Sequence, residues 1–218
     1  MWSVAESTVD ENRTLPVSPP PPWPAPVRAT VWWHRATDDA RSIGPKNSLP
    51  ITVGAVIDYL DSPVGPYREI LASPTTVKPG RGLGPLPRVA IPFIAVDSDA
   101  SVHGGRTHWN LPKVLAEFTG DVLGEAGAQG EGWSVSTASI PVGPTFPVIG
   151  STGFAQPTTG GLLLASGRMR GRARFAKVTV TSDGPTLGTW LPPGTYRGIQ
   201  VVSGKIVTGP ARNLPQPR

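Results

Sequence analysis

The chain of 218 residues contains no cysteine and very little histidine. Without cysteine it has no disulfide, no thiolate metal site, no iron–sulfur cluster and no cysteine nucleophile. The histidines are His34, His103 and His108, so a three-histidine metal site would need all of them. Any chemistry must therefore rest mainly on other side chains, and we expect no metal site.

Charged residues are also scarce, at 16% of the chain against about 25% in an average domain. The formal net charge is nevertheless +5 and the sequence pI is about 10.0, because acidic residues are few rather than basic ones many. A basic protein suits nucleic acid or an anionic small molecule. The net charge alone does not choose between these two partners.

Long apolar runs are missing as well. The longest aliphatic run covers residues 162–164, far short of the ~20 residues that span a bilayer. Residues 1–12 carry Glu6, Asp10 and Glu11 and contain no apolar stretch of the kind found in signal peptides. We therefore expect a cytoplasmic protein with no membrane partner.

Glycine and proline, in contrast, are abundant, with 26 and 27 residues. Both residues break helices and favour turns, which argues against a helical bundle. Hydrophobic residues make up 38% of the chain and include 7 tryptophans, enough for the core of one sizeable domain.

The residue pattern predicts a mainly β fold: a single antiparallel domain, barrel-like or cone-like or else sandwich-like. Residues 1–26 are predicted to form a proline-rich arm that lies across the domain or a neighbouring subunit with Trp23 as its anchor, and residues 27–218 to form the β domain. Runs of β-branched and aromatic residues predict strands over residues 31–34, 51–60, 67–72, 88–96, 132–140, 161–165, 168–181 and 198–209. Exposed strand edges favour burial between copies, so we expect a homo-oligomer.

One short helix is predicted, over residues 111–118. Asn110 suits its N-cap and Pro112 its first turn, where a missing N–H costs nothing. Leu111, Leu115 and Phe118 would then share one face.

Lys113 would lie in the first turn of this helix. The positive end of the helix dipole and the apolar neighbours both disfavour an ammonium group there. A neutral lysine amine is the nucleophile that forms a Schiff base with a carbonyl substrate. The alternative is a surface lysine paired with Glu117 four residues later, and from position alone this ion pair is the preferred interpretation.

A second basic feature is the arginine-rich strand. Alternation of side chains predicts that Arg168, Arg170, Arg172 and Arg174 lie on one face. This face could bind phosphates, but aromatic residues, which a single-strand binder needs, are limited to Phe175. We favour a solvated face or a subunit contact, and expect no nucleic-acid partner.

Four short segments resemble the signature of the acetoacetate decarboxylase family. Residues 97–99 match its Asp-x-Asp/Glu element, residues 105–107 its Gly-Arg-Glu triplet and residues 112–114 its Pro-Lys-Lys element. Upstream, residues 67–69 match Tyr-x-Glu. The resemblance spans most of the chain and is specific between residues 65 and 117.

The resemblance implies roles for particular residues. Lys113 would be the Schiff-base lysine, and Glu69 the active-site carboxylate that moves a proton or orients groups, so the two should lie close together. Arg106 matches the Gly-Arg element, for which we favour a structural part, and an arginine of the first strand contacts substrate in the family. The candidates for substrate binding are Arg28, Arg35, Tyr67, Arg106 and Trp109.

Two positions depart from the family pattern. Val114 replaces the second lysine of Pro-Lys-Lys, and Thr107 replaces the glutamate of Gly-Arg-Glu. In acetoacetate decarboxylase a neighbouring cation activates the lysine. Here activation would have to come from desolvation and from the helix end.

The resemblance implies a Schiff-base decarboxylase of a small β-keto acid that needs no metal or organic cofactor. Two alternatives stay open within the same fold: a Schiff-base lyase of another type, such as an aldolase or dehydratase acting on a keto acid, and a non-catalytic member that binds a small molecule. The third alternative lies outside this fold family and is an unrelated basic β domain that binds nucleic acid.

Overall fold

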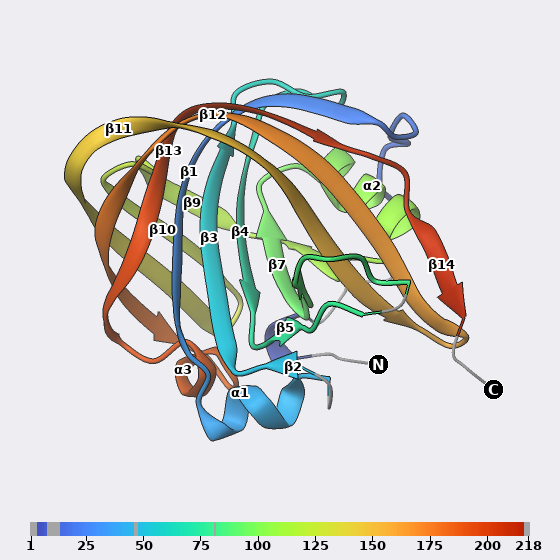
Figure 1. Ribbon diagram of the computed structural model, residues 1–218, viewed down its shortest axis with the longest axis horizontal. Helices are drawn as coiled ribbons and strands as arrows, with labels where there is room; N and C mark the ends of the chain where they lie inside the picture. Colours follow the sequence, from blue (N-terminus) through green and yellow to red (C-terminus); the bar gives the residue numbers. More distant parts are fainter. Residues whose placement is uncertain (1–3, 8–13, 46–47, 81, 216–218) are drawn as a thin grey trace.

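One strongly curled β-sheet dominates the computed structural model, which describes residues 4–7, 14–45, 48–80 and 82–215 (Figure 1). The strands in chain order are β1 (Trp23–Arg35), β2 (Ser48–Leu49), β3 (Ile51–Tyr59), β4 (Tyr67–Ser73), β5 (Thr76–Val77), β6 (Arg88–Val89), β7 (Phe93–Val96), β8 (Lys113–Leu115), β9 (Glu117–Gly120), β10 (Glu125–Gly130), β11 (Trp133–Thr158), β12 (Gly161–Asp183), β13 (Gly194–Thr208) and β14 (Arg212–Pro215). The helices are the 3-10 turn η1 (Ala5–Ser7), α1 (Asp38–Ile43), α2 (Asp99–Trp109) and α3 (Leu187–Trp190).

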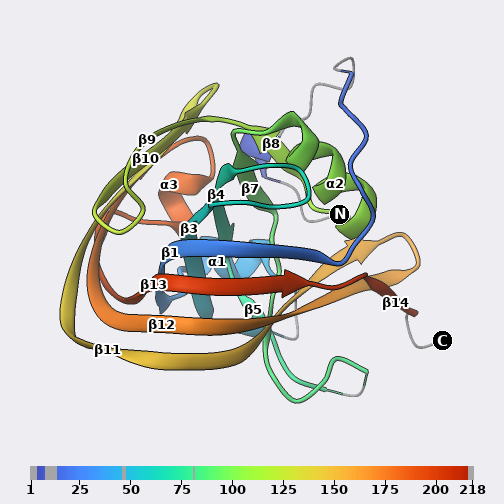
Figure 2. The ribbon, with the colours of Figure 1, turned by 90° about the horizontal axis from the view of Figure 1, so that it is seen from above.

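The main path through the sheet runs β2-β5-β6-β11-β12-β13-β1-β3-β4-β7-β8. Its pairs are antiparallel except β7 with β8 and β6 with β11, which are parallel. Because the sheet curls, β11, β12, β13 and β1 form one wall, and α2 lies opposite them beside β7 and β8 (Figure 2). The predicted mainly β domain is confirmed, and its sheet is curled into a half-barrel rather than stacked as a sandwich.

Most predicted strands are present, with different bounds. The segments 161–165 and 168–181 belong to one long strand, β12, which forms a hairpin with the slightly longer β11. The predicted strand over residues 88–96 is divided into β6 and β7. Pro92 lies in the gap between them, and a proline has no N–H to donate to a ladder.

Strand β1 begins inside the segment that the sequence predicts to be an arm. Pro24 and Pro26 lie in its ladder with β13. Strand β3 stops pairing with β1 at Tyr59, so on that side no other described strand pairs with the two prolines. Proline is tolerated on such an edge because its missing N–H would face away from the ladder.

The residues before β1 lie across α2. Ser18 is buried, and its Oγ is 2.8 Å from Nδ1 of His103 on α2. Trp23 follows, packed edge-to-face against Trp109 with the ring centroids 4.9 Å apart. The described part of the arm is therefore held against the domain, with Trp23 as its anchor.

The predicted helix over residues 111–118 is wrong, and Lys113 lies instead in β8. The helix precedes this segment as α2, with Ser98 as its N-cap. Asn110 ends α2 in the left-handed conformation, with φ 52°, and Pro112 follows. Asn110 and Pro112 fit a helix end as well as a helix start, because Asn adopts the left-handed C-cap and Pro commonly follows it.

Two glycines conceal α2 in the sequence. Gly104 and Gly105 lie inside the helix, where glycine is unfavourable by about 1 kcal/mol relative to alanine. A Cβ on Gly104 would overlap the Trp23 ring, and a Cβ on Gly105 would overlap the aliphatic part of Lys113. Close packing therefore explains the glycines that local propensity assigns to a turn.

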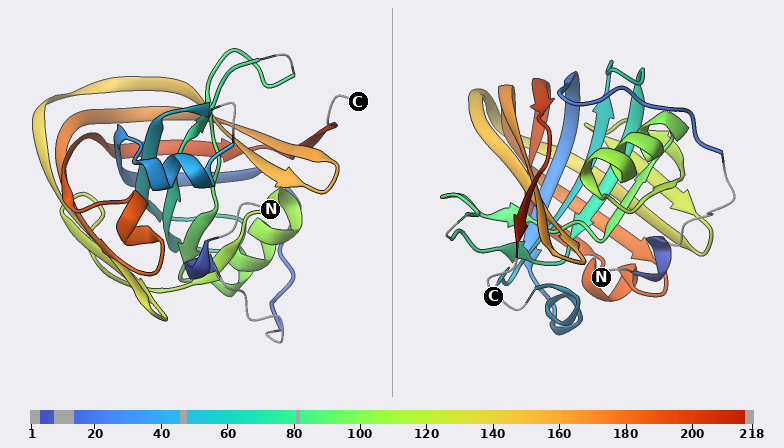
Figure 3. Two further views of the ribbon diagram at one scale, coloured as in Figure 1. Left: turned by 90° about the horizontal axis from the view of Figure 1, so that it is seen from below. Right: turned by 90° about the vertical axis from the view of Figure 1, so that its right-hand side faces the viewer.

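The number of helices is also larger than the single helix predicted, because α1 and α3 accompany α2. Helices α1 and α3 lie together at one end of the sheet (Figure 3). Thr37 caps α1, with its Oγ1 accepting from the Ala40 N–H at 3.1 Å. No helix in the described ranges is long and apolar enough to cross a bilayer.

The arginine-rich strand does not keep all four arginines on one face. Arg168, Arg170 and Arg172 are exposed, but Arg174 is half-buried and its Nε donates to Gln200 Oε1 at 2.7 Å. Strand β12 changes its exposed side where its registers with β11 and β13 are irregular. The continuous four-arginine stripe is therefore wrong.

Candidate active site

Lys113 is buried, with only 2% of its surface exposed. Its Nζ donates to Glu69 Oε2 at 2.7 Å and to Ser101 Oγ at 2.9 Å. Glu117 does not pair with it and instead accepts from Gln129 at 3.0 Å. The interpretation of Lys113 as a surface lysine paired with Glu117 is therefore wrong.

Glu69 reaches Lys113 from β4, two strands away in the sheet. Strand β4 pairs with β7, and β7 pairs in parallel with β8, which brings together residues 44 apart in the chain. Glu69 is 3% exposed, and its second oxygen, Oε1, accepts from the Tyr59 hydroxyl at 3.1 Å. The predicted proximity of Glu69 and Lys113 is confirmed.

Two tyrosines complete the surroundings of this pair. Tyr59 and Tyr67 face each other across the β3–β4 hairpin with their rings stacked at 4.3 Å. The Tyr67 ring centroid lies 5.2 Å from Lys113 Nζ, within range of a cation–π contact. Burial, reinforced by the charge of Glu69, raises the pKa of each tyrosine well above the ordinary value for a tyrosine hydroxyl. Both hydroxyls therefore stay protonated at neutral pH and can donate hydrogen bonds.

Arg106 holds the backbone of Lys113. Its Nε and Nη2 donate to the Lys113 carbonyl at 2.9 and 2.6 Å. Gly105, the residue before it, leaves room for the Lys113 side chain to pass α2. The Gly-Arg element thus positions the lysine, and Arg106 does not line the adjacent pocket.

A pocket of about 340 Å³ opens above the amine of Lys113. Its lining is mainly aliphatic and aromatic, and Lys113 is the only basic side chain among the described residues that form it. The wall is made by Trp23, Ala25, Ile57, Tyr59, Ser62, Tyr67, Glu69, Leu71, Pro87, Val89, Ile91, Ile94, Trp109, Leu111, Lys113, Ser151, Gly153, Phe154, Gly167, Ile206 and Thr208.

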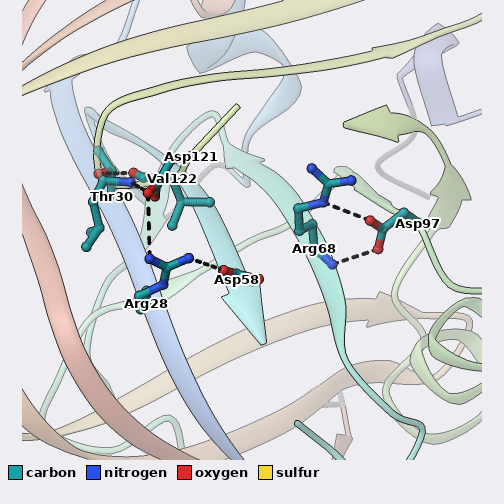
Figure 4. A network of polar contacts seen from close by, with 8 residues as sticks. Arg28, Thr30, Asp58, Arg68, Asp97, Asp121 and Val122 are labelled. Atoms are coloured by element: carbon teal, nitrogen blue, oxygen red, sulfur yellow. Dashed lines mark hydrogen bonds and ion pairs between the residues drawn. The ribbon is translucent and has the colours of Figure 1, made fainter. Parts of the chain in front are cut away.

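The predicted substrate-binding residues divide into two groups. Tyr67 and Trp109 line the pocket with Lys113, but Arg28 and Arg35 do not. Arg28 instead pairs with Asp58 at 2.7 Å and lies 3.6 Å from Asp121 (Figure 4). Arg35 is exposed at the end of β1.

The site also contains residues that the sequence analysis did not single out. Tyr59 could have been found, because a hairpin joining the predicted strands 51–60 and 67–72 places it near Tyr67. Ser101 gave no comparable signal, since its helix was not predicted. In the described ranges no three His, Asp or Glu side chains gather where they could hold a metal ion.

Comparison with solved structures shows what the fold resembles. An acetoacetate decarboxylase from Legionella pneumophila subsp. pneumophila str. Philadelphia 1 matches with a TM-score of 0.65 at 14% identity, over 95% of this chain and 94% of that one. An acetoacetate decarboxylase-like enzyme from Sphingomonas wittichii RW1 gives 0.60 at 14% identity, over 89% and 93%. The enduracididine biosynthesis enzyme MppR, complexed with the condensation product of pyruvate and imidazole 4-carboxaldehyde, gives 0.58 at 16% identity, over 89% of each chain.

Comparison at the level of sequence gives no such match. No model of a protein family matches it, and neither does any curated protein. The evidence for this likeness is therefore three-dimensional: a similar curled sheet extends over nearly the whole length of both chains. The chain has the acetoacetate decarboxylase-like fold.

Proposed function

We propose that the chain is a decarboxylase of β-keto acids that forms a Schiff base through Lys113. One observation carries the proposal: the Lys113 amine is buried in the wall of an apolar pocket, 2.7 Å from the Glu69 carboxylate. A lysine amine in an apolar pocket, with a group beside it that can take its proton, is the arrangement that imine formation needs.

Glu69 supplies the route to a neutral amine. Transfer of one proton along the hydrogen bond turns the ammonium–carboxylate pair into an amine and a carboxylic acid. Burial favours this transfer, because both charged forms lose the solvation that water gives them. Activation therefore rests on Glu69 and on burial rather than on a helix end, since Lys113 lies in a strand, and Val114 provides no second cation.

Lys113 and Glu69, together with solvent water, then carry the reaction through each step. Nζ bonds to the ketone carbon, and its surplus proton passes through Glu69 to the former carbonyl oxygen, giving a carbinolamine. Protonated Glu69 next gives its proton to the hydroxyl, which leaves as water and creates a cationic imine. The carbon–carbon bond electrons move into this cation, so carbon dioxide leaves and a neutral enamine remains. The enamine carbon takes a proton derived from solvent, and water releases the ketone and restores the ammonium of Lys113.

The lining of the pocket favours decarboxylation over the aldol-type alternative. An aldolase or dehydratase acting on a keto acid retains the carboxylate, which then needs a partner of its own. Among the described lining residues, no basic side chain besides Lys113 could provide it. The complex of MppR, a protein of similar fold, holds a product of pyruvate condensation, so aldol-type chemistry is the second candidate.

Borohydride trapping tests the proposal directly. With acetoacetate, reduction should fix the imine on Lys113 as a secondary amine whose mass shows the loss of carbon dioxide. Lys113→Ala should abolish trapping and turnover, and Lys113→Arg should do the same because a guanidinium group stays charged. Lys177→Ala, at an exposed lysine on β12, is the matched control and should change neither.

The mass of the adduct separates the alternatives. An adduct of pyruvate that keeps its carboxylate, without turnover of any β-keto acid, would replace decarboxylation by aldol-type chemistry. If folded protein formed no adduct with either class of keto acid, a non-catalytic binding function would remain.

A further inference from the structure

We infer that the pocket is built for a β-keto acid with a long hydrocarbon tail, rather than for a four-carbon one. This inference rests on the proposed Schiff-base chemistry of Lys113 and names the substrate class of that same site. A volume of about 340 Å³ is roughly eleven times the share of one water molecule in liquid water. It lies at the lower end of the range of about 300–1,000 Å³ that is typical of pockets for drug-sized ligands.

The pocket has a closed end and an open end. Lys113 and Glu69 are almost fully buried at the closed end, whereas Pro87 and Ser151 are exposed in the same lining. A keto acid whose carbonyl carbon reaches Lys113 must therefore extend the rest of its chain toward the open end. A longer tail on the ketone, opposite the carboxylate, would have to occupy this same space between Lys113 and the opening.

Two tryptophans show what kind of tail the wall accepts. The indole N–H of Trp23 donates to the Pro19 carbonyl at 2.9 Å, and that of Trp109 donates to the Gly209 carbonyl at 3.0 Å. Since both polar atoms are already bonded to backbone, the two rings have only carbon surface left to contact a ligand. Their edge-to-face packing also fixes their position before any ligand binds.

The remaining wall is of the same kind. Ile91, Ile94 and Leu111 are buried in one apolar cluster with the two tryptophans, and Phe154 packs against that cluster while remaining partly exposed. The other polar side chains of the lining, apart from the tyrosines, Glu69 and Lys113, are serines and a threonine. A hydrocarbon tail needs no hydrogen-bond partner and gains from such a wall, whereas a charged or sugar-like tail would lose its hydration without compensation.

The experiment compares turnover of 3-oxobutanoate and 3-oxooctanoate by the purified full-length chain. Each methylene that enters an apolar pocket is worth about fourfold in affinity, so kcat/KM should be at least tenfold higher for 3-oxooctanoate. Phe154→Ala should lower kcat/KM for the longer substrate more than for the shorter one. Phe175→Ala, which truncates an exposed phenylalanine outside the pocket, is the matched control and should leave the ratio as it is.

The outcomes separate this inference from the proposed function. If both substrates are trapped on Lys113 and the longer one has no advantage, the tail inference is overturned while the chemistry stands. If neither is trapped, the proposed function fails, and binding of 2-heptanone and acetone measured by calorimetry decides about the pocket. Tighter binding of 2-heptanone, weakened by Phe154→Ala, supports the hydrocarbon-binding pocket; equal or undetectable binding of both ketones overturns it.

Discussion

Lys113 is held by groups from different elements of the fold. Glu69 comes from β4, Ser101 from α2 and the Tyr67 ring from the start of β4, while Arg106 fixes the lysine backbone. Several independent contacts therefore fix the position of the Lys113 amine. What Glu69 adds beyond position is the ability to take a proton, which neither Ser101 nor a tyrosine ring provides.

Glu69→Gln tests this distinction. The amide keeps nearly the same shape and can still accept a hydrogen bond, but it cannot carry the proton between the amine and the substrate oxygen. We expect kcat to fall by about 10²–10⁴-fold, with a much smaller change in KM. Steady-state kinetics and the rate of borohydride trapping measure both quantities.

Glu117→Gln is the control, because Glu117 is an exposed carboxylate on β9 away from the pocket. It should leave both kinetic constants as they are. If Glu69→Gln raised KM and left kcat intact, Glu69 would be a binding group and the proton-transfer role would be refuted.

The pair itself was predictable from short motifs, whereas the arginines were not. Short motifs of about three residues each were enough to indicate a role for Tyr67, Glu69 and Lys113. The position of the Arg28 side chain is set by its ion-pair partners Asp58 and Asp121. These two residues lie on β3 and in the loop before β10, and only the tertiary fold brings them to Arg28. Partners so distant in the chain leave no local signal.

The segment from α2 to β8 shows how tertiary packing overrides local preference. Two adjacent glycines predict a turn, yet they lie inside a helix because larger residues would overlap Trp23 and Lys113. The same packing makes α2 part of the site: Gly105 admits the lysine side chain and Ser101 binds its amine. A sequence pattern reports intrinsic propensity, and here the contacts made by the folded chain decide.

Gly105→Ala should therefore damage catalysis more than stability. The added methyl group would overlap the Lys113 side chain and displace its amine from Glu69. Alanine also favours the helix by up to about 1 kcal/mol, which offsets part of the strain on folding. We expect kcat/KM to fall at least tenfold, since small misplacements of a reacting group are costly, while the midpoint of chemical unfolding changes little.

Gly150→Ala is the control for this variant, because a Cβ at Gly150 on β11 meets no heavy atom within 4 Å. Its activity should match that of the unaltered chain. Full activity in Gly105→Ala would show that the lysine does not need this passage past α2.

At the scale of the whole molecule, the outer face of the sheet leaves some large apolar side chains exposed to solvent. Four large apolar side chains are exposed on the long hairpin of β11 and β12, namely Ile140, Val142, Ile149 and Phe175. Such residues are the kind that contacts between subunits cover. Homo-oligomer formation, expected from the sequence, stays a prediction.

The mainly β class and most strands could be predicted, because runs of β-branched and aromatic residues are a local signal. The order of strands could not, since it is set by pairs such as β1 with β13 and β7 with β8 that are distant in the chain or parallel. The half-barrel follows from these long-range pairs. The pocket exists only because they bring β1, β4 and β11 around one space.

One buried carboxylate, Glu6, joins the N-terminal turn η1 to the start of α3. It accepts from the Thr186 and Leu187 N–H groups, at 2.6 and 2.7 Å, and also from the Thr186 hydroxyl. Burial opposes ionisation, but these hydrogen bonds outweigh it and hold the pKa of Glu6 below its ordinary value. A carboxyl group whose pKa is lower in the folded than in the unfolded chain stabilises the fold when it is ionised.

This contribution is fully present above about pH 5 and is lost as the pH falls through the lowered pKa of folded Glu6. Glu6→Gln should therefore reduce the free energy of unfolding by about 1–3 kcal/mol at pH 7. The difference from the unaltered chain should shrink toward pH 3, because protonation removes the charge from Glu6 as well. Urea unfolding at several pH values measures it, with the exposed Glu131→Gln as control. A difference that stayed constant from pH 7 to pH 3 would show that Glu6 acts by packing, not through its charge.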